Sequence, residues 1–298
     1  MKLLFTGAHG FLGRNVIPIL RANSLEVKTL GTHQGDYIID LKKEVPRFDE
    51  QCEVIFHAAG KAHSIPSGAE EEKEFFEVNY NGTVNLCGAL KNRLPKVFIY
   101  VSTVAVYGKE WGKNIDENTS LMGESPYAKS KILAEEFLQQ WCAENGVKLF
   151  ILRPSLIAGP NPPGNLGDMI KAVKSNRYFN IGGGKAEKSI FWVEDFAGLI
   201  MKLINTEKEG SYNVCDSENY SFKEISEMIS QKLGKNKPLN IPMSVAKLLG
   251  ITGDFFGDRF PINSQRLKKM TESLTFSNHK LTSELGFIPS AIKDKFQI

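Results

Sequence analysis

The chain has 298 residues, of which 42% are hydrophobic, and its formal net charge is +3 from 37 basic and 34 acidic residues. This composition supports a packed core, and the length suits one large domain or two closely joined lobes. The near balance of charge does not favour a nucleic-acid or membrane partner, and no apolar stretch approaches the ~20 residues of a membrane-spanning helix. We therefore expect a soluble cytoplasmic protein.

The four cysteines are too far apart in sequence to form a metal-binding motif: Cys52, Cys87, Cys142 and Cys215. The five histidines are equally scattered, so no zinc site can be built from them. We expect reduced, mostly buried thiols and no bound metal.

Short apolar runs alternate with segments of helical period along the first half of the chain. Strands are predicted over residues 3–5, 25–30, 37–39, 54–57, 97–101, 147–152 and 211–214. Helices are predicted over residues 10–21, 71–92, 127–145, 166–175, 193–205, 222–233 and 245–249. Apolar strands separated by helices are typical of a parallel sheet covered on both faces. The predicted fold is therefore α/β, a Rossmann-type doubly wound parallel sheet.

The character of the sequence changes near residue 158. A rigid, turn-forming stretch rich in proline and glycine occupies residues 159–164, and fewer strands are predicted beyond it. We expect a dinucleotide-binding domain over 1–158 plus 188–216. A smaller, mostly helical substrate-binding lobe should comprise 159–187 plus 217–298.

A glycine-rich turn joins the first predicted strand to the first predicted helix. Gly7, Gly10 and Gly13 would let backbone amides approach a pyrophosphate, and Phe11 and Leu12 lie between them. The amino terminus of the following helix adds unpaired N–H groups and a partial positive charge. The spacing differs by one residue from the usual Rossmann fingerprint. Its position between a strand and a helix predicts dinucleotide binding.

The end of the second strand leaves the choice of cofactor open. An acidic residue there would bind the adenosine ribose and favour NAD, but this chain has Gly31-Thr32-His33. No arginine stands there to meet the 2′-phosphate of NADP. We therefore expect NAD or NADP. Asp40 and Leu41, after the third strand, are candidate contacts to the adenine.

A tyrosine and a lysine lie four residues apart on a predicted helix. Tyr127 and Lys131 would share one face of that helix. A lysine cation ~5 Å away, at an effective dielectric of ~20, would lower the tyrosine pKa by about two units. Thr103 follows the strand over 97–101 and could hydrogen-bond the substrate oxygen that Tyr127 deprotonates.

Taken together, these motifs and several others in order resemble the extended short-chain dehydrogenase/reductase family, within its nucleotide-sugar epimerase/dehydratase group. The likeness covers most of the chain. Its further pieces are His57-Ala58-Ala59, Val78-Asn79, the run 101–108, Leu152-Arg153-Pro154, Gly159-Pro160, the run 191–195 and Tyr212-Asn213-Val214.

The resemblance implies roles for individual residues. Tyr127 would be the acid/base, Lys131 its activator and a ligand of the cofactor ribose, and Thr103 the hydroxyl partner. Further cofactor contacts are implied at Ala58, Ala59, Asn79 and Pro154. The implied substrate contacts are Asn165, Leu166, Lys188, Arg259 and Arg266.

Two absences narrow the implied reaction. Dehydratases of this group carry an acidic pair where Val104 and Ala105 stand, and enzymes that epimerise C3 and C5 often place a cysteine at Ala105. Hydride transfer at C4 of a nucleoside-diphosphate sugar remains, UDP-linked by preference, as in a 4-epimerase. The alternatives are an NAD(P)H-dependent 4-ketoreductase, a reductase of a non-nucleotide carbonyl, and a non-catalytic dinucleotide-binding regulator. The family also implies a homodimer through the catalytic helix.

Overall fold

The computed structural model describes residues 1–62, 66, 68–256 and 264–296. Its strands are β1 (Lys2–Thr6), β2 (Glu26–Gly31), β3 (Tyr37–Ile38), β4 (Val54–His57), β5 (Val97–Val101), β6 (Gly112–Ile115), β7 (Lys148–Pro154), β8 (Leu156–Ala158), β9 (Asn180–Ile181), β10 (Glu187–Trp192), β11 (Gly210–Val214), β12 (Asn219–Ser221), β13 (Asn240–Ile241) and β14 (Leu274–Phe276).

The α-helices are α1 (Phe11–Ala22), α2 (Ala69–Phe76), α3 (Gly82–Leu90), α4 (Pro126–Asn145), α5 (Gly164–Lys174), α6 (Asp195–Ile204), α7 (Phe222–Lys232), α8 (Met243–Phe256), α9 (Ser264–Thr271), α10 (His279–Leu285) and α11 (Ile292–Lys295). A π-helical segment, η1 (Glu77–Asn81), joins α2 to α3, and a 3₁₀ helix, η2 (Val104–Tyr107), follows β5.

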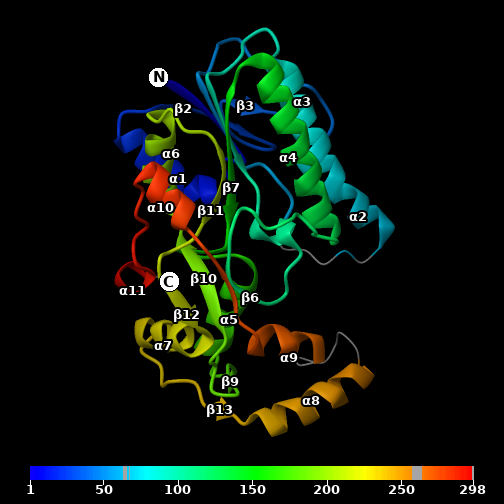
Figure 1. Ribbon diagram of the computed structural model, residues 1–298, viewed down its shortest axis with the longest axis vertical. Helices are drawn as coiled ribbons and strands as arrows, with labels where there is room; N and C mark the ends of the chain where they lie inside the picture. Colours follow the sequence, from blue (N-terminus) through cyan, green and yellow to red (C-terminus); the bar gives the residue numbers. More distant parts are fainter. Residues whose placement is uncertain (63–65, 67, 257–263, 297–298) are drawn as a thin grey trace.

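Seven parallel strands form the main sheet, in the order β11-β7-β5-β4-β1-β2-β3. Alternate residues of each strand face opposite sides, so neighbours such as Leu3 and Leu4 enter different cores. One core packs the sheet against α1, α6 and α10, and the other packs it against α3 and α4. Figure 1 shows these two helical layers on either side of the strands. The predicted doubly wound sheet is confirmed.

The second lobe has a sheet of its own that the sequence pattern did not predict. Strands β12, β10, β14 and β6 lie side by side in that order, and β8 pairs with β10. Strand β10 therefore pairs in this sheet rather than in the main one, although residues 188–192 were assigned to the dinucleotide-binding domain. These strands are short and lack regular alternation, and β14 pairs with β6 some 160 residues earlier along the chain. Local periodicity cannot detect such pairing.

The helix predicted over 71–92 is interrupted in the structure. Its middle is the π-helical segment η1, which contains the buried Asn79. A π-bulge adds a residue to one turn and is common at functional sites. The sequence carried no signal for it, because every residue in the segment is compatible with an α-helix.

Candidate active site

The carboxyl ends of four neighbouring strands meet at one edge of the main sheet. The segments that leave this edge are the glycine turn after β1, Ala58-Ala59 after β4, Ser102-Thr103 after β5 and the end of β7 at Pro154. Ligands of doubly wound sheets bind at this edge. The parallel order of β1, β4, β5 and β7 therefore gathers the predicted cofactor and catalytic residues.

The glycine turn leaves no room for a side chain at Gly7 or Gly13. A Cβ on Gly13 would lie 2.0 Å from the carbonyl oxygen of Ala8. Gly7 has a φ of +70°, and a Cβ there would lie 2.8 Å from the backbone of Ala58 and Ala59. The turn therefore packs closely against both α1 and the loop after β4.

Helix α1 leaves its first amides free for an anion. Its N-cap is Gly10, no side chain caps it, and no acidic residue occupies its first turn. The N–H groups of a first helical turn have no intrahelical partners, and the helix dipole favours negative charge beside them. Together with the glycine turn, this amino terminus fits the pyrophosphate of a dinucleotide.

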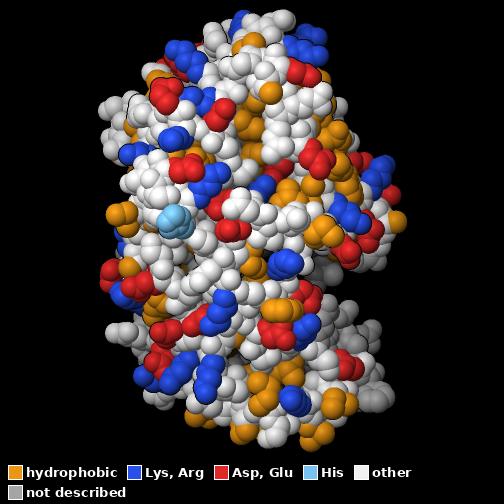
Figure 2. Space-filling model, viewed as in Figure 1, with side chains coloured by type: hydrophobic (Ala, Val, Ile, Leu, Met, Phe, Trp, Pro, Cys, Tyr) orange, Lys and Arg blue, Asp and Glu red, His pale blue; other side chains and the backbone are white. Residues whose placement is uncertain are grey.

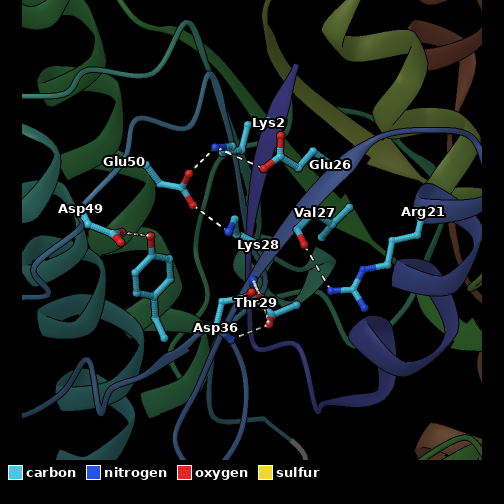
Figure 3. Close-up of polar contacts among 10 residues, drawn as sticks. Lys2, Arg21, Glu26, Val27, Lys28, Thr29, Asp36, Asp49 and Glu50 are labelled. Carbon is cyan, nitrogen blue, oxygen red and sulfur yellow. Dashed lines mark hydrogen bonds and ion pairs between the residues drawn. The ribbon is translucent and has the colours of Figure 1, made fainter.

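The residues near the end of β2 are shown in Figure 3. The carboxylate of Asp36 accepts hydrogen bonds from the backbone N–H of Thr29, at 2.9 Å, and from its hydroxyl, at 2.7 Å. These bonds, the one from the hydroxyl above all, lower the pKa of Asp36. The carboxylate of Asp36 is therefore held by Thr29 of β2 and is not a free acid. The sequence-based ambiguity between NAD and NADP is unchanged.

The adenine candidates lie just beyond β3. The carboxylate of Asp40 accepts the backbone N–H of Lys42 at 3.2 Å and lies 3.5 Å from the Lys43 ammonium. Leu41 is buried, and its carbonyl accepts a hydrogen bond from Asn85. The side chain of Leu41 thus belongs to the core, while that of Asp40 stays near the surface.

A buried histidine connects the glycine turn to η1. Thr83 donates its proton to the carbonyl of Asn79, so it accepts from Nε2–H of His57, at 2.9 Å. The Thr6 hydroxyl accepts the N–H of Ala59 and therefore donates to Nδ1 of His57, at 2.7 Å. With a neutral imidazole, every donor and acceptor in this row of hydrogen bonds has a partner. Burial, with Lys131 adding repulsion, lowers the pKa of His57 to about 3.

Asn79 links the loop after β4 to the catalytic helix. Its amide nitrogen donates to Ser130 on α4, at 2.9 Å, and to the carbonyl of Lys61, at 3.1 Å. Its amide oxygen accepts the N–H of Lys61 at 2.8 Å. The structure thus gives this predicted cofactor contact an orienting position beside α4.

Helix α4 presents Tyr127 and Lys131 to the sheet edge. Ser125 caps the helix through a 3.2 Å bond from the N–H of Ala128, and Pro126 occupies its first position. The start of the helix is therefore well defined, which positions Tyr127 in its first turn. The hydroxyl of Thr103 accepts the N–H of Ala105 at 3.2 Å, and it lies close enough to Tyr127 to influence the pKa of that phenol.

The electrostatics of Tyr127 differ from the sequence-based expectation. Burial raises the pKa of Tyr127, and the nearby Thr103 hydroxyl opposes part of that rise. The lowering by Lys131 stays a prediction. The ammonium of Lys131 donates to the carbonyl of Val101 at 2.8 Å and lies 4.6 Å from the centre of the Tyr100 ring.

Lys131 lies in an environment that disfavours its charge. Its side chain is buried, and burial lowers its pKa to about 7, with Glu135 acting in the opposite direction. Near neutral pH this lysine can therefore gain or lose a proton. Its protonation becomes sensitive to whatever charge binds beside it.

Behind Lys131, one turn further along α4, lies a buried ion pair that the sequence did not predict. Glu135 pairs with Arg153 of β7, with Oε2 2.6 Å from Nη2, and also accepts a hydrogen bond from Ser102. Arg153 in turn donates to the Tyr107 hydroxyl at 3.2 Å, and that hydroxyl donates to Asn213 at 2.7 Å. The spacing of Glu135 four residues after Lys131 was the available signal, but its partner lies on a different element.

The structure does not gather all the predicted substrate contacts. Asn165 is exposed at the start of α5, whereas the side chain of Leu166 packs in the core of the second lobe. Lys188 is partly buried, and its ammonium donates to the carbonyl of Glu272 at 3.0 Å. Burial lowers the pKa of Lys188. Arg259 lies outside the described residues, and for Arg266 the structure describes only its place in α9.

The described part of the chain contains no group of histidine, cysteine and carboxylate side chains arranged to hold a metal. Nor does any helix within it combine the length and apolar character needed to cross a membrane. All four cysteines are buried and unpaired, as predicted.

Comparison with known proteins identifies the family. The model of the NAD dependent epimerase/dehydratase family matches residues 3–215. The chain belongs to this family. It is therefore an NAD(P)-dependent enzyme, as its glycine turn and Tyr127–Lys131 pair predicted.

Its relatives carry out several reactions. It is 26% identical, over 96% of its length and 90% of the relative's, to N-acetyl-α-D-glucosaminyl-diphospho-ditrans,octacis-undecaprenol 4-epimerase of Escherichia coli O157:H7. It is 26% identical to GDP-6-deoxy-D-mannose reductase of Pseudomonas aeruginosa, over 77% of this chain and 79% of that one.

Solved structures share the fold. UDP-glucuronic acid 4-epimerase from Bacillus cereus, in complex with UDP-glucuronic acid and NAD, superposes with a TM-score of 0.77 at 20% identity, covering 99% of this chain and 96% of that one. RMD from Pseudomonas aeruginosa, complexed with NADPH, gives a TM-score of 0.74 at 22% identity, covering 98% and 95%.

Proposed function

We propose that this enzyme transfers hydride at C4 of a nucleoside-diphosphate sugar as a 4-epimerase. The observation that supports this most is local. Thr103 lies close enough to Tyr127 at the edge of the sheet to lower the pKa of that phenol, and the Lys131 ammonium is held on the carbonyl of Val101. The two residues after Thr103 are the apolar Val104 and Ala105. Proton transfer at one hydroxyl is available there, whereas neither Val104 nor Ala105 can move a proton to eliminate water.

The residues act on one substrate hydroxyl. Thr103 orients it by hydrogen bonding, and Tyr127 accepts its proton and later returns it. Burial raises the pKa of Tyr127. We expect a charged Lys131 to stabilise the phenolate and so to oppose that rise during the reaction. A bound NAD(P) supplies the hydride acceptor and donor for the same carbon. Gly7, Gly10 and Gly13 would hold its pyrophosphate.

The sugar carrier is proposed from the relatives. Solved structures with this fold include enzymes in complex with UDP-glucose or UDP-glucuronic acid, which supports a UDP-linked substrate. Asn165 is exposed at the start of α5, so its side chain is accessible to a ligand. Lys188 can serve a diphosphate only if its ammonium leaves the carbonyl of Glu272.

A 4-ketoreductase is the second candidate, because the acid near the end of β2, Asp36, is already hydrogen-bonded within the protein and does not select NAD. Asp36 is bound to Thr29, so no preference for NAD over NADP comes from that side chain. A relative that is a reductase and a structural neighbour holding NADPH support the same alternative. The regulator hypothesis remains weakest, since family membership makes the chain an enzyme.

Purified protein should be incubated with UDP-glucose, UDP-galactose and their N-acetyl forms, with NAD(H) or NADP(H) in turn. Absorbance at 340 nm and the product sugars are then measured. C4-inverted sugar without net change in absorbance is expected. Stoichiometric loss of NAD(P)H only with a 4-keto sugar would instead establish the reductase. Dinucleotide binding with no sugar conversion would contradict both.

We further propose a cytoplasmic homodimer formed through α3 and α4. These helices border a surface cavity of about 490 Å³ whose lining includes Cys87, Phe137 and Trp141. Leu133, on α4, is 39% exposed. A Leu133→Asp variant should shift the mass from light scattering toward that of a monomer, whereas the matched Leu239→Asp variant should not.

A further inference from the structure

Helix α8 buries small residues and exposes several large apolar ones, which is unusual for a helix whose only contacts are within its own chain. Its buried positions hold its small residues: Ala246, Gly250 and Gly253. Three of the large apolar residues whose burial the structure describes in α8 are exposed, with Val245 at 47%, Leu248 at 65% and Ile251 at 55%. An ordinary surface helix shows the reverse arrangement.

Helical geometry separates these two sets. At about 100° per residue, the three large residues lie within about 120° of the helix circumference, on the side opposite the three small ones. The small side fits closely against α9, because a Cβ on Gly250 would lie 3.3 Å from Leu267. The fold thus uses the glycine side for packing and leaves the large apolar side without a partner in the described chain.

The same region carries the excess positive charge of the chain. Residues 232–272 contain eight basic and three acidic residues, a net of +5, so the rest of a chain with net charge +3 carries −2. The exposed lysines of this segment in the described chain are Lys232, Lys235, Lys237, Lys247, Lys268 and Lys269. Two of these lysines also have acidic neighbours, since Lys237 pairs with Glu227 and Lys268 lies 3.9 Å from Glu110. Figure 2 shows mainly orange side chains over α8 at the lower end of the molecule, with blue side chains gathered beside them over α7.

We propose that α8 and these lysines form a surface that binds an anionic lipid bilayer peripherally. The exposed apolar stripe shares α8 with the exposed Lys247, and the other lysines flank the helix along the sequence. An interfacial helix has this composition, and its apolar face enters the headgroup region while lysines reach the phosphates. Each lysine near an anionic membrane contributes about a fivefold increase in affinity. The near-neutral net charge of the whole chain does not reveal this local excess of lysines.

A second copy of the same surface is disfavoured by charge. In a two-fold contact each patch meets itself, so a segment of net charge +5 would face another of +5. An anionic bilayer can bury the apolar residues and pair with the lysines at the same time. The experiment below also distinguishes binding of another protein from binding of a bilayer.

The test is sedimentation of the full chain with sucrose-loaded vesicles, without substrate. Vesicles of phosphatidylcholine alone are compared with vesicles containing about 30% phosphatidylglycerol. We expect at least about tenfold tighter binding to the anionic vesicles, weakened by high salt. The triple variant Val245→Ser, Leu248→Ser and Ile251→Ser should lose about tenfold or more of this affinity.

A matched control removes equally exposed apolar residues elsewhere. Val45, Ile38 and Ile288 are 51%, 62% and 80% exposed, and their triple serine variant should bind vesicles within about twofold of the parent. Circular dichroism melting and dinucleotide binding establish that both variants fold.

Three results would overturn the proposal: no binding of the parent to anionic vesicles, equal losses in the two triple variants, or binding that ignores lipid charge. A change of mass in light scattering caused only by the α8 variant would assign the surface to a protein contact instead. Because no substrate is present, these outcomes do not depend on the proposed reaction.

Discussion

The carboxylate of Glu135 forms an ion pair with Arg153, with 2.6 Å between Oε2 and Nη2, in a part of the molecule where both side chains are at most 5% exposed. The pair joins the catalytic helix α4 to β7. Because Glu135 also accepts a hydrogen bond from Ser102, it supports the backbone that carries Thr103. The relative positions of Tyr127 and Thr103 therefore depend on a contact remote from the substrate.

Removing one charge of this pair should be costly. Glu135→Gln leaves the Arg153 guanidinium buried without its counter-ion, so we expect the free energy of unfolding to fall by about 3–5 kcal/mol. The double variant Glu135→Gln with Arg153→Met removes the uncompensated charge and should recover part of that loss. Urea unfolding of the parent and of the single and double variants measures this. A double variant less stable than Glu135→Gln would contradict the argument.

The same single variant should change the pH dependence of activity. Glu135 raises the pKa of Lys131 against the burial that lowers it to about 7. Without that charge the pKa falls further, and Lys131 loses its proton at lower pH. We expect the alkaline limb of kcat to move to lower pH in Glu135→Gln, measured on the converted sugar. If the alkaline limb of the kcat–pH profile stays in place while the maximal kcat falls, Glu135 has a purely structural role.

Tyr127→Phe should lose about 10²–10⁴-fold in kcat, because the acid/base group is removed. Dinucleotide binding and thermal stability should stay close to those of the parent. The matched control is Tyr178→Phe, since the buried hydroxyl of Tyr178 has no hydrogen-bond partner among the described residues. That variant should keep its activity and gain up to about 1 kcal/mol of stability. Parental activity in Tyr127→Phe would remove the proposed mechanism.

Gly13→Ala should weaken dinucleotide binding at least tenfold, because its Cβ would meet the Ala8 carbonyl at 2.0 Å and displace the glycine turn. Gly198→Ala, in the middle of α6, is the control. A Cβ there meets only the Phe287 ring at 3.5 Å, so helix propensity should raise stability by about 0.5–1 kcal/mol. Fluorescence titration with NAD(H) and NADP(H) gives the affinities. Similar losses of dinucleotide affinity in both variants would count against the glycine turn as the pyrophosphate site.

Stability should fall in mild acid because of His57. Its pKa is about 3 in the folded chain, against about 6.5 when unfolded, so the unfolded state binds more protons between these values. Lowering the pH from 6.5 to 4.5 should therefore cost about 2.3 kcal/mol from this residue. His57→Gln should be less stable at pH 7 but lose less on acidification. Parallel stability profiles for the two proteins would show that His57 does not titrate in this way.

The sequence by itself determined the main sheet and the chemistry at its edge. Short apolar strands alternating with helices have a local period, and the glycine turn and the Tyr127–Lys131 pair each lie within a few residues. Such patterns are visible before folding, because their meaning depends on neighbours along the chain. The parallel sheet and its two helical layers followed from them, whereas the strand order came from the structure.

The tertiary structure alone decided which residues surround that chemistry. The π-helical turn at Asn79, the partner of Glu135 and the pairing of β14 with β6 depend on residues tens to hundreds of positions apart. The same holds for the direction of the Tyr127 pKa, which burial sets, and for the face of α8 that meets solvent. Burial and long-range pairing arise only when the chain is packed, so no local pattern records them.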